Sequence, residues 1–194
     1  MDNGSNDGTD VAARDAGANI VRENKRGYGA ACLAGIAALP PATNIILFMD
    51  ADGSDVPKEA LKLLEPIIAG NADMMIGSRA LGDIEAGAMT PPQRFGNWLS
   101  TWLVRLFWQK NITDLGPFRA IRRDALEKLA MADEDFGWTI EMQVKAIQHD
   151  MRVMESPADY RKRLGVSKIS GTIKGVWGAG TKILYVIGRE AFFR

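Results

Sequence analysis

Short apolar runs along the chain predict strands, and the clearest of them ends in acidic residues. Residues 44–49 form an apolar run of strand length that is followed by Asp50, and residues 73–77 form a second, shorter run. Such runs are typical of strands buried on both faces of a parallel sheet. Further strands are predicted over residues 19–22, 118–122 and 153–161.

Helical spacing, capping residues and proline or glycine breakers place helices between these strands. Asp7 or Thr9 can cap the first helix, Pro40-Pro41 ends the second, and Pro57 begins the third. The predicted helices cover residues 10–18, 27–39, 57–69, 91–110, 124–130, 138–149 and 170–194. The alternation of strand and helix implies an open, mostly parallel α/β sheet flanked by helices. Ligands of such sheets bind beyond the carboxyl ends of the strands.

The composition restricts the chemistry that the chain can carry. Its 194 residues, 46% hydrophobic and 25% charged, suit one globular domain. Basic and acidic residues number 24 each, which argues against a nucleic-acid partner. A single cysteine, Cys32, excludes an internal disulfide and favours a reducing, cytoplasmic compartment, and a single histidine, His149, excludes a two-histidine metal site. No signal peptide opens the sequence, and no apolar stretch is long enough to span a bilayer.

The strongest local signal is the acidic loop after the run at residues 44–49. Asp50 and Asp52 leave the end of a buried strand at positions i and i+2, so their side chains point the same way while the chain stays extended. Hard oxygen ligands in this arrangement suit Mg²⁺ or Mn²⁺ bound to a diphosphate. Two alternatives remain: an acidic turn that only ends a strand, and an aspartyl-phosphate phosphatase with the first Asp as nucleophile. The phosphatase needs a later acidic pair, for which Asp83 has no matching partner.

A second motif opens the chain. Residues 2–9, Asp-Asn-Gly-Ser-Asn-Asp-Gly-Thr, are rich in residues that tolerate positive φ and end at a predicted helix N-terminus. Followed by the Asp-Ala-Asp of residues 50–52, this loop resembles the paired motifs of family 2 glycosyltransferases with the GT-A fold. Gly27-x-Gly29, by contrast, lacks the third glycine of a dinucleotide fingerprint.

Further motifs extend this resemblance along nearly the whole chain, towards the polyprenyl-phosphate (dolichyl-phosphate) hexose synthases. They follow one another in the family's order at plausible spacing. They are Asn-Lys-Arg-Gly-Tyr-Gly at 24–29, Gly-Ser-Arg at 77–79, Thr-Asp-Leu-Gly-Pro-Phe-Arg at 113–119, Glu141, and Gly-Val-Ser-Lys at 165–168.

The resemblance implies a role for each matching residue in hexose transfer from a nucleotide sugar. Asp2 would contact the nucleoside, and Asp50 and Asp52 would hold the metal on the diphosphate. The side chains expected at the phosphates of donor or acceptor are Arg79, Arg94, Arg163, Ser167 and Lys168. The family's arginine near the Gly-x-Ser-Lys segment corresponds either to Arg161 or to Arg163, and without the motifs these arginines would be read as solvated surface residues.

Two predicted helices bear on the acceptor. Phe95, Trp98, Trp102 and Leu106 recur at helical spacing in the first, and residues 170–194 form a basic, aromatic-rich amphipathic helix. Such helices lie in a membrane interface, here the cytoplasmic face, although a helix packed on the domain or on a second subunit has a similar pattern.

The expected reaction is a metal-dependent, inverting hexose transfer to a polyprenyl phosphate, from a donor of the UDP-glucose or GDP-mannose type. A phosphate acceptor is already anionic and needs no strong base. A hydroxyl acceptor would need one, and Glu141 or Asp114 is then the candidate.

We expect a glycosyltransferase domain over residues 1–169 and an amphipathic helix over 170–194. Family members normally begin with a strand and a P-x-x-N-E loop that this sequence lacks, so we expect a domain without its first βα unit. An open sheet edge would then invite a homodimer or strand exchange. The remaining alternative is a nucleotide-sugar-binding fragment with little activity.

Overall fold

The computed structural model describes residues 1–165 and 173–192, with only the helical backbone described at 173–176. Four strands form one open sheet in the order β1-β3-β2-β4. Their bounds are Ile45–Phe48 (β1), Met74–Ser78 (β2), Arg119–Arg122 (β3) and Val153–Pro157 (β4). β4 pairs with β2 in parallel, whereas β3 runs antiparallel to both β1 and β2. Three of the four strands therefore run in one direction, and the predicted open α/β sheet is confirmed.

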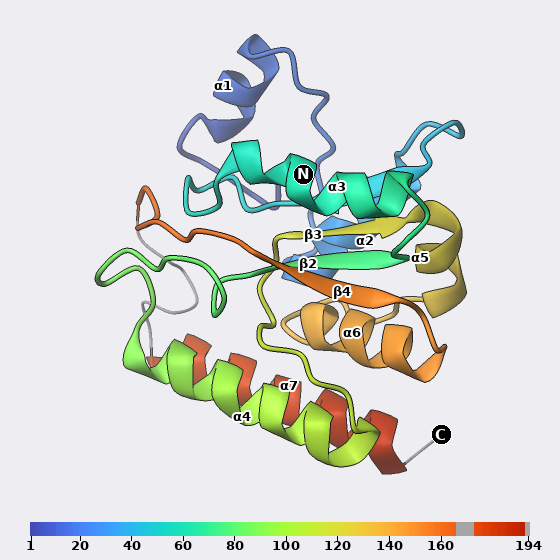
Figure 1. Ribbon diagram of the computed structural model, residues 1–194. Helices are drawn as coiled ribbons and strands as arrows, with labels where there is room; N and C mark the ends of the chain where they lie inside the picture. The colour runs from blue at the N-terminus through green and yellow to red at the C-terminus, as the bar shows by residue number, and fades with distance from the viewer. Residues whose placement is uncertain (166–172, 193–194) are drawn as a thin grey trace.

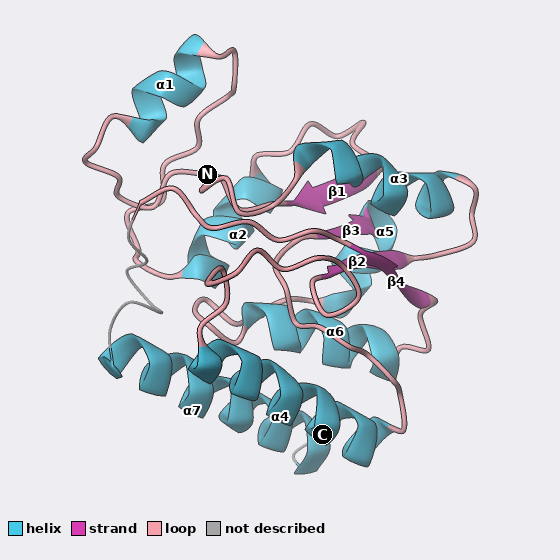
Figure 2. Ribbon diagram, turned by 60° about the vertical axis from the view of Figure 1, so that its left-hand side comes forward, coloured by secondary structure: helices cyan, strands magenta, loops and turns pink. Residues whose placement is uncertain are grey.

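Helices cover both faces of this sheet and add a further layer below it (Figure 1). Their bounds are Thr9–Asp15 (α1), Tyr28–Ala37 (α2), Ala60–Ile68 (α3), Pro91–Trp108 (α4), Arg123–Leu129 (α5), Trp138–Gln148 (α6) and Ile173–Phe192 (α7). A short 3₁₀ turn, Pro57–Glu59, leads into α3. Figure 2 shows α1 at the margin of the molecule, in agreement with its lack of buried residues.

The core explains why β1 and the first three residues of β2 are apolar without alternation. Met74 and Ile76 of β2 pack towards α5 and α6, whereas Met75 between them packs with Leu63 and Ile67 of α3. Since successive side chains of a strand point to opposite faces, a strand covered on both sides is apolar at every position. A third cluster joins α4, α6 and α7 through residues such as Val104, Val144 and Val186.

The amphipathic tail helix α7 is held on the domain by charge as well as by apolar contact. Nζ of Lys182 lies 2.9 Å from the carboxylate of Asp133, and Nη2 of Arg189 lies 3.3 Å from that of Glu141. Asp133 and Glu141 are both buried. One face of α7 therefore packs on the domain, as one of the two readings of its pattern predicted.

One predicted strand is wrong. Residues 19–22 form no strand, and Arg22 makes a single isolated bridge with Asp2. The amide of Asp2 donates to the carbonyl of Val21 over 2.9 Å, and the amide of Glu23 donates to the carbonyl of Asp2 over 2.9 Å. A strand needs a neighbour that continues beside it, and this pairing stops after one residue. The other predicted elements are present with shifts of a few residues at their ends.

Candidate active site

The acidic loop that follows β1 folds around its own carboxylates. The backbone amide of Ser54 donates to Oδ1 of Asp52 over 3.0 Å, and its hydroxyl donates to the same oxygen over 2.5 Å. The amide of Asp50 donates to Oδ2 of Asp55 over 3.0 Å. Gly53 between them has φ of 78°, a conformation that favours glycine. The loop therefore fixes the carboxylates of Asp52 and Asp55 by its own hydrogen bonds at the carboxyl end of β1.

Burial and mutual repulsion raise the pKa values of carboxyl groups in this loop. Burial raises the pKa of Asp50 from its ordinary 3.8 to about 6, and the charges of Asp55 and Asp52 add to the shift. Burial also raises the pKa of Asp55. A carboxylate with a raised pKa lacks sufficient compensation of its charge, and a cation beside it would supply that compensation.

A later segment of the chain lies across the acidic loop and brings a guanidinium to it. The amide of Arg161 donates to the carbonyl of Ser54 over 2.9 Å, and the amide of Leu164 donates to the carbonyl of Asp52 over 2.7 Å. Nη2 of Arg163 lies 3.2 Å from Oδ2 of Asp52. Arg161 is exposed, so of the two arginines between which the sequence left the choice open, the geometry favours Arg163.

A second arginine faces the loop from the end of β2. Nε of Arg79 donates to Oδ2 of Asp114 over 2.8 Å and Nη2 donates to Oδ1 over 2.7 Å, a bidentate pair. The Arg79 guanidinium also lies over the ring of Tyr160 at 5.1 Å from its centre. A side chain at Gly116 would approach both partners, since its Cβ would lie 3.0 Å from Oδ2 of Asp114 and 3.1 Å from Nε of Arg79. The ion pair with Asp114 therefore fixes the direction of the Arg79 guanidinium, and a side chain at position 116 would disturb it.

Hydrogen bonds join the loop of residues 2–9 to the Asn-Lys-Arg-Gly-Tyr-Gly segment of residues 24–29. Nδ2 of Asn3 donates to the carbonyls of Glu23 and Lys25, and Oδ1 of Asn3 accepts from the amide of Gly27. Asp2 is buried, and a hydrogen bond from Ser5 to its carboxylate lowers its pKa. The sequence did not show that Asn3 joins the two motifs, because its partners lie 20 to 24 residues away.

Gly27 and Gly29 serve close packing. A Cβ on Gly27 would lie 2.2 Å from the carbonyl oxygen of Glu134, and a Cβ on Gly29 would lie 2.0 Å from that of Asp133. The amide of Ala30 donates to the Glu134 carbonyl over 2.8 Å. The start of α2 therefore packs directly against the backbone of residues 133–134. The approach is so close that only glycine fits at positions 27 and 29.

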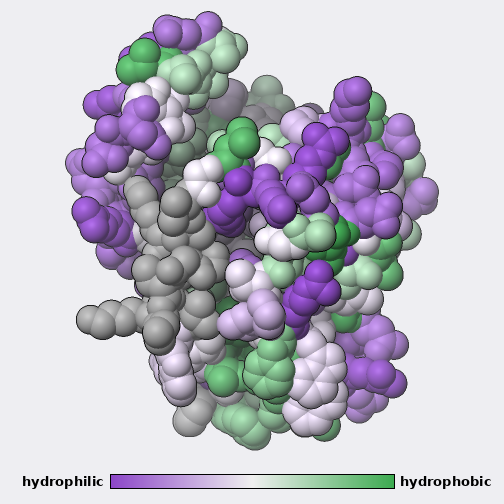
Figure 3. Space-filling view, turned by 90° about the vertical axis from the view of Figure 1, so that its left-hand side faces the viewer, coloured by the Kyte–Doolittle hydropathy of each residue, from purple (hydrophilic) through white to green (hydrophobic). Residues whose placement is uncertain are grey.

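A cavity of about 520 Å³ connects the charged residues to the two lowest helices. Asp50, Arg79 and Arg163 line its charged part, and the other lining residues come mostly from α4 and α7, such as Leu99 and Ile183. In Figure 3 apolar side chains gather at the lower part of the molecule, at the height where α4 and α7 lie.

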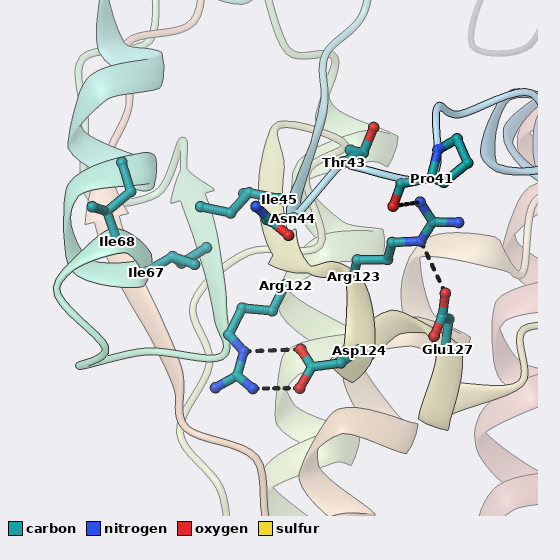
Figure 4. A pocket seen from close by; sticks show the side chains of 10 residues that line it. All are labelled: Pro41, Thr43, Asn44, Ile45, Ile67, Ile68, Arg122, Arg123, Asp124 and Glu127. Carbon is teal, nitrogen blue, oxygen red and sulfur yellow. Dashed lines mark hydrogen bonds and ion pairs between the residues drawn. The ribbon is translucent and has the colours of Figure 1, made fainter.

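A second, larger cavity of about 750 Å³ lies at the other end of the sheet (Figure 4). It is lined by Arg122 and Arg123, which pair with Asp124 and Glu127. None of the motif residues lines it, and its charges are compensated. The smaller cavity is therefore the candidate active site.

Comparison with known proteins decides the family. The family described as glycosyl transferase family 2 matches residues 1–130. The chain belongs to this family, and it is an enzyme.

Sequence relatives of this family 2 glycosyltransferase include one without an assigned substrate and two named for lipid phosphates. An uncharacterised glycosyltransferase of Mycobacterium tuberculosis is 35% identical, with 90% of this chain and 78% of the relative covered. The polyprenol monophosphomannose synthase of Mycolicibacterium smegmatis is 34% identical, over 89% of this chain and 69% of the relative. The undecaprenyl-phosphate mannosyltransferase of Micrococcus luteus is 30% identical, over 90% of this chain and 76% of the relative.

Solved structures confirm the GT-A fold of this glycosyltransferase. Glucosyl-3-phosphoglycerate synthase of Mycobacterium tuberculosis, in complex with Mn²⁺, UDP and phosphoglyceric acid, superposes with a TM-score of 0.75 at 14% identity, over 100% of this chain and 67% of that one. The same synthase with Mn²⁺, UDP and its glucosylated product gives a TM-score of 0.74 at 15% identity. The chain thus spans about two thirds of the solved neighbour.

The two carboxylates predicted as bases do not line the cavity of this glycosyltransferase. Asp114 is fully buried and holds Arg79. Glu141 is also fully buried, and it lies 2.9 Å from Nζ of Lys145 and accepts from the amide of Asp133 over 2.8 Å. Glu141 is therefore a buried, ion-paired carboxylate, and for both carboxylates the geometry favours a positioning role.

Of the remaining predicted phosphate ligands, Arg94 is described by the structure, and it is not among the residues that line the cavity. Arg94 is exposed on the first turn of α4, beside the cavity residues Gln93 and Phe95. Ser167 and Lys168 lie outside the described residues.

Arg119, the last residue of the motif at 113–119, is a buried basic residue that does not line the cavity. Arg119 of β3 is buried and donates to the carbonyls of Leu115, Gly116 and Thr139. Burial lowers its pKa to about 10. Its Nε has no hydrogen-bond partner among the described residues. The Arg119 guanidinium therefore holds the backbone of residues 115–116 and of residue 139 together, a role that its place in the motif did not reveal.

Proposed function

We propose that this glycosyltransferase transfers a hexose from a nucleotide-diphosphate sugar to a polyprenyl phosphate, with inversion and with Mg²⁺ or Mn²⁺ at Asp50 and Asp52. One observation carries the proposal. The cavity between α4 and α7 is mainly apolar, and its charged end brings together Asp50, Arg79 and Arg163. An apolar cavity that ends in guanidinium groups suits a lipid chain that ends in a phosphate.

The acidic loop supports the metal part of the proposal. Its carboxylate oxygens are the ligand type that Mg²⁺ and Mn²⁺ prefer. Within the residues that the structure describes, no group of three or more His, Cys, Asp or Glu forms a metal site, so diphosphate oxygens and water would complete the coordination. The metal would supply stabilisation of the charge that develops on the departing diphosphate.

The joined loops of residues 2–5 and 23–27 support a place for the nucleoside. Asp2 is held by two backbone hydrogen bonds and by Ser5, so its carboxylate is fixed before any ligand arrives. A preorganised acceptor group of this kind can bind the hydroxyls or the base of a nucleoside.

The arrangement of the buried carboxylates supports a phosphate acceptor over a hydroxyl. A hydroxyl must lose its proton as it attacks, whereas a phosphate is already anionic. Both candidate bases, Asp114 and Glu141, are engaged in ion pairs. Arg79 and Arg163 would hold the acceptor and donor phosphates, and Arg94, Ser167 and Lys168 are proposed as further phosphate ligands.

The outer surface of α4 and α7 supports peripheral contact with a membrane, at its cytoplasmic face. The side chains of Trp98 and Trp102 are 58% and 48% exposed, and that of Trp177, which also lines the cavity, is 70% exposed. Aromatic residues on a helix surface with nearby basic residues are typical of interfacial helices. No helix in the described part of the chain combines the length and hydropathy needed to cross a bilayer.

The names of the sequence relatives suggest the first donor to try. Two of them are named for mannose transfer to a lipid phosphate, which favours GDP-mannose. UDP-glucose is the second candidate, because the solved neighbour binds UDP at a similar fold.

A matched pair of acceptors tests the proposal. The protein would be incubated with Mn²⁺ and labelled GDP-mannose or UDP-glucose, and with either a polyprenyl phosphate or the corresponding polyprenol. We expect label in the lipid phosphate alone. Transfer only to the alcohol, abolished by Glu141→Gln, would establish the alternative with a carboxylate base.

A further inference from the structure

Asn97 of α4 holds the backbone on both sides of Asp114. Its Nδ2 donates to the carbonyl of Thr113 over 2.9 Å, and its Oδ1 accepts from the amide of Leu115 over 2.9 Å. Both halves of the side-chain amide are therefore used, one on each side of the residue that binds Arg79. An asparagine that satisfies two backbone groups at once fixes its own rotamer and the loop that it binds.

Two other side chains complete this support. The amide of Asp114 donates to Oε1 of Glu155 over 3.2 Å, and the carbonyl of Asp114 accepts from Nε2 of Gln143 over 2.8 Å. The segment 113–115 is thus held from α4, α6 and β4.

The carboxylate of Asp114 passes this constraint to Arg79. It accepts from the backbone amide of Arg79 over 2.7 Å as well as from its guanidinium, and from the amide of Gly116 over 3.1 Å. With these donors in place the carboxylate has no freedom to rotate alone. The direction of the Arg79 guanidinium therefore depends on where segment 113–115 lies.

Of the three supporting side chains, only Asn97 also lines the cavity between α4 and α7. It belongs to the helix whose Phe95 and Leu99 form the apolar wall. A lipid chain in the cavity would contact that wall and also Leu115, which lines the cavity itself, and Asn97 ties the helix of the wall to the segment that holds Arg79.

We propose that Asn97 is a positioning residue that couples the cavity between α4 and α7 to Arg79, so that a lipid chain and its phosphate are recognised together. This inference rests on the proposed function for the identity of the ligand. It gives Asn97 a role in recognising the headgroup although its side chain contacts the protein backbone. Loss of its amide would remove the support of segment 113–115 from α4 and let Arg79 shift, whereas the bonds from Gln143 and Glu155 and the apolar wall would remain.

Direct binding of two short probes tests the coupling. Farnesyl phosphate and farnesol share one lipid chain and differ in the phosphate, and their binding to the full chain would be followed by tryptophan fluorescence or calorimetry. In Asn97→Ala we expect affinity for farnesyl phosphate to fall about tenfold, as expected for lost positioning of a charged group. Affinity for farnesol should stay within about twofold of that of the unaltered protein. Such a change is smaller than the loss of a hydrogen bond to the ligand would cause.

Matched variants separate this role from a general loss of structure. Thr101→Ala removes a hydroxyl that donates to the Trp98 carbonyl on the same helix, away from the cavity, and should leave the preference for phosphate unchanged. Asn97→Leu keeps the branched shape of the side chain without its hydrogen bonds and should behave like Asn97→Ala, and it serves if the smaller variant fails to fold. In the background of Arg79→Lys, Asn97→Ala should have little further effect on farnesyl phosphate.

The outcomes are distinguishable. If the unaltered protein binds farnesol as tightly as farnesyl phosphate, the proposed phosphate acceptor is wrong. If it prefers farnesyl phosphate and both Asn97 variants keep that preference, or if the effects of Asn97→Ala and Arg79→Lys simply add, Asn97 does not position Arg79.

Discussion

Nη2 of Arg163 lies 3.2 Å from Oδ2 of Asp52, so a cation of the protein itself already neutralises one of the two carboxylates expected to hold the metal. The other oxygen of Asp52 accepts from Ser54. A metal ion that binds Asp52 must compete with Arg163, and the displaced guanidinium is then free for a phosphate. Metal and diphosphate are therefore expected to bind together.

Replacement of Arg163 should have opposite effects on the two ligands. Because the competing cation is removed, Arg163→Gln should bind Mn²⁺ without nucleotide about two- to fivefold more tightly, the range for a partly exposed ion pair. It should bind UDP or GDP in the presence of Mn²⁺ more weakly. Electron paramagnetic resonance of free Mn²⁺ measures the first effect. Arg161→Gln, at an exposed neighbour, is the control, and weaker Mn²⁺ binding by Arg163→Gln alone would contradict the competition.

The raised pKa of Asp50 predicts a pH-dependent cost in the metal-free protein. Since its pKa rises from 3.8 to about 6 on folding, its protonated form favours the fold at low pH, and this contribution is lost as the pH rises through about 6. Asp50→Asn should therefore raise the thermal midpoint of the metal-free protein at pH 7 and leave it nearly unchanged at pH 4. Asp52→Asn, which breaks a pair with Arg163, should give no such gain. A lower midpoint for Asp50→Asn at pH 7 would refute the account of the shift.

The close approach at Gly116 makes that position sensitive to a single methyl group. In Gly116→Ala the added Cβ would lie 3.0 Å from Asp114 and 3.1 Å from Arg79, so the pair must move. We expect a loss of about 1–3 kcal/mol in the free energy of unfolding, typical of overpacking. We also expect weaker binding of a lipid phosphate. Gly188→Ala, where a Cβ meets open space, is the control. Equal behaviour of the two variants in chemical denaturation would show that the site tolerates the methyl group.

Glu141 should act through stability and not as a base. Glu141→Gln removes the charge that pairs with Lys145 and Arg189, so we expect a loss of about 2 kcal/mol in the free energy of unfolding, moderated by the partial exposure of both cations. The shape of the pH profile of transfer should stay the same, because no proton acceptor is lost. Denaturation curves and the pH dependence of kcat give the two readouts. Disappearance of one limb of the pH profile at unchanged stability would restore Glu141 as a base.

The order of elements could be predicted well from the sequence, because a strand that is packed on both faces appears as a continuous apolar run. Residues 45–48 and 74–76 pack on both faces and are apolar throughout, and Pro91-Pro92 marks the start of α4. Residues 19–22 have a strand-like composition, but their backbone finds a neighbour only at Asp2, a fact of tertiary structure.

The site was predictable in its residue types and not in their pairing. The position of Asp50 and Asp52 after a buried strand could be inferred locally. The engagement of Asp114 with Arg79, 35 residues away, and of Glu141 with Arg189 depends on packing between distant segments. The same holds for Asn97, whose partners lie 16 and 18 residues further on and whose residue type alone carries no signal.

The central claim, that the loop after β1 binds a metal–diphosphate group, is tested most directly by calorimetric titration of UDP and GDP into the protein with and without Mn²⁺. We predict heat of binding for at least one nucleotide only when Mn²⁺ is present, and its loss in Asp50→Asn and in Asp52→Asn. No heat for either nucleotide, or binding that both variants retain, would contradict the claim.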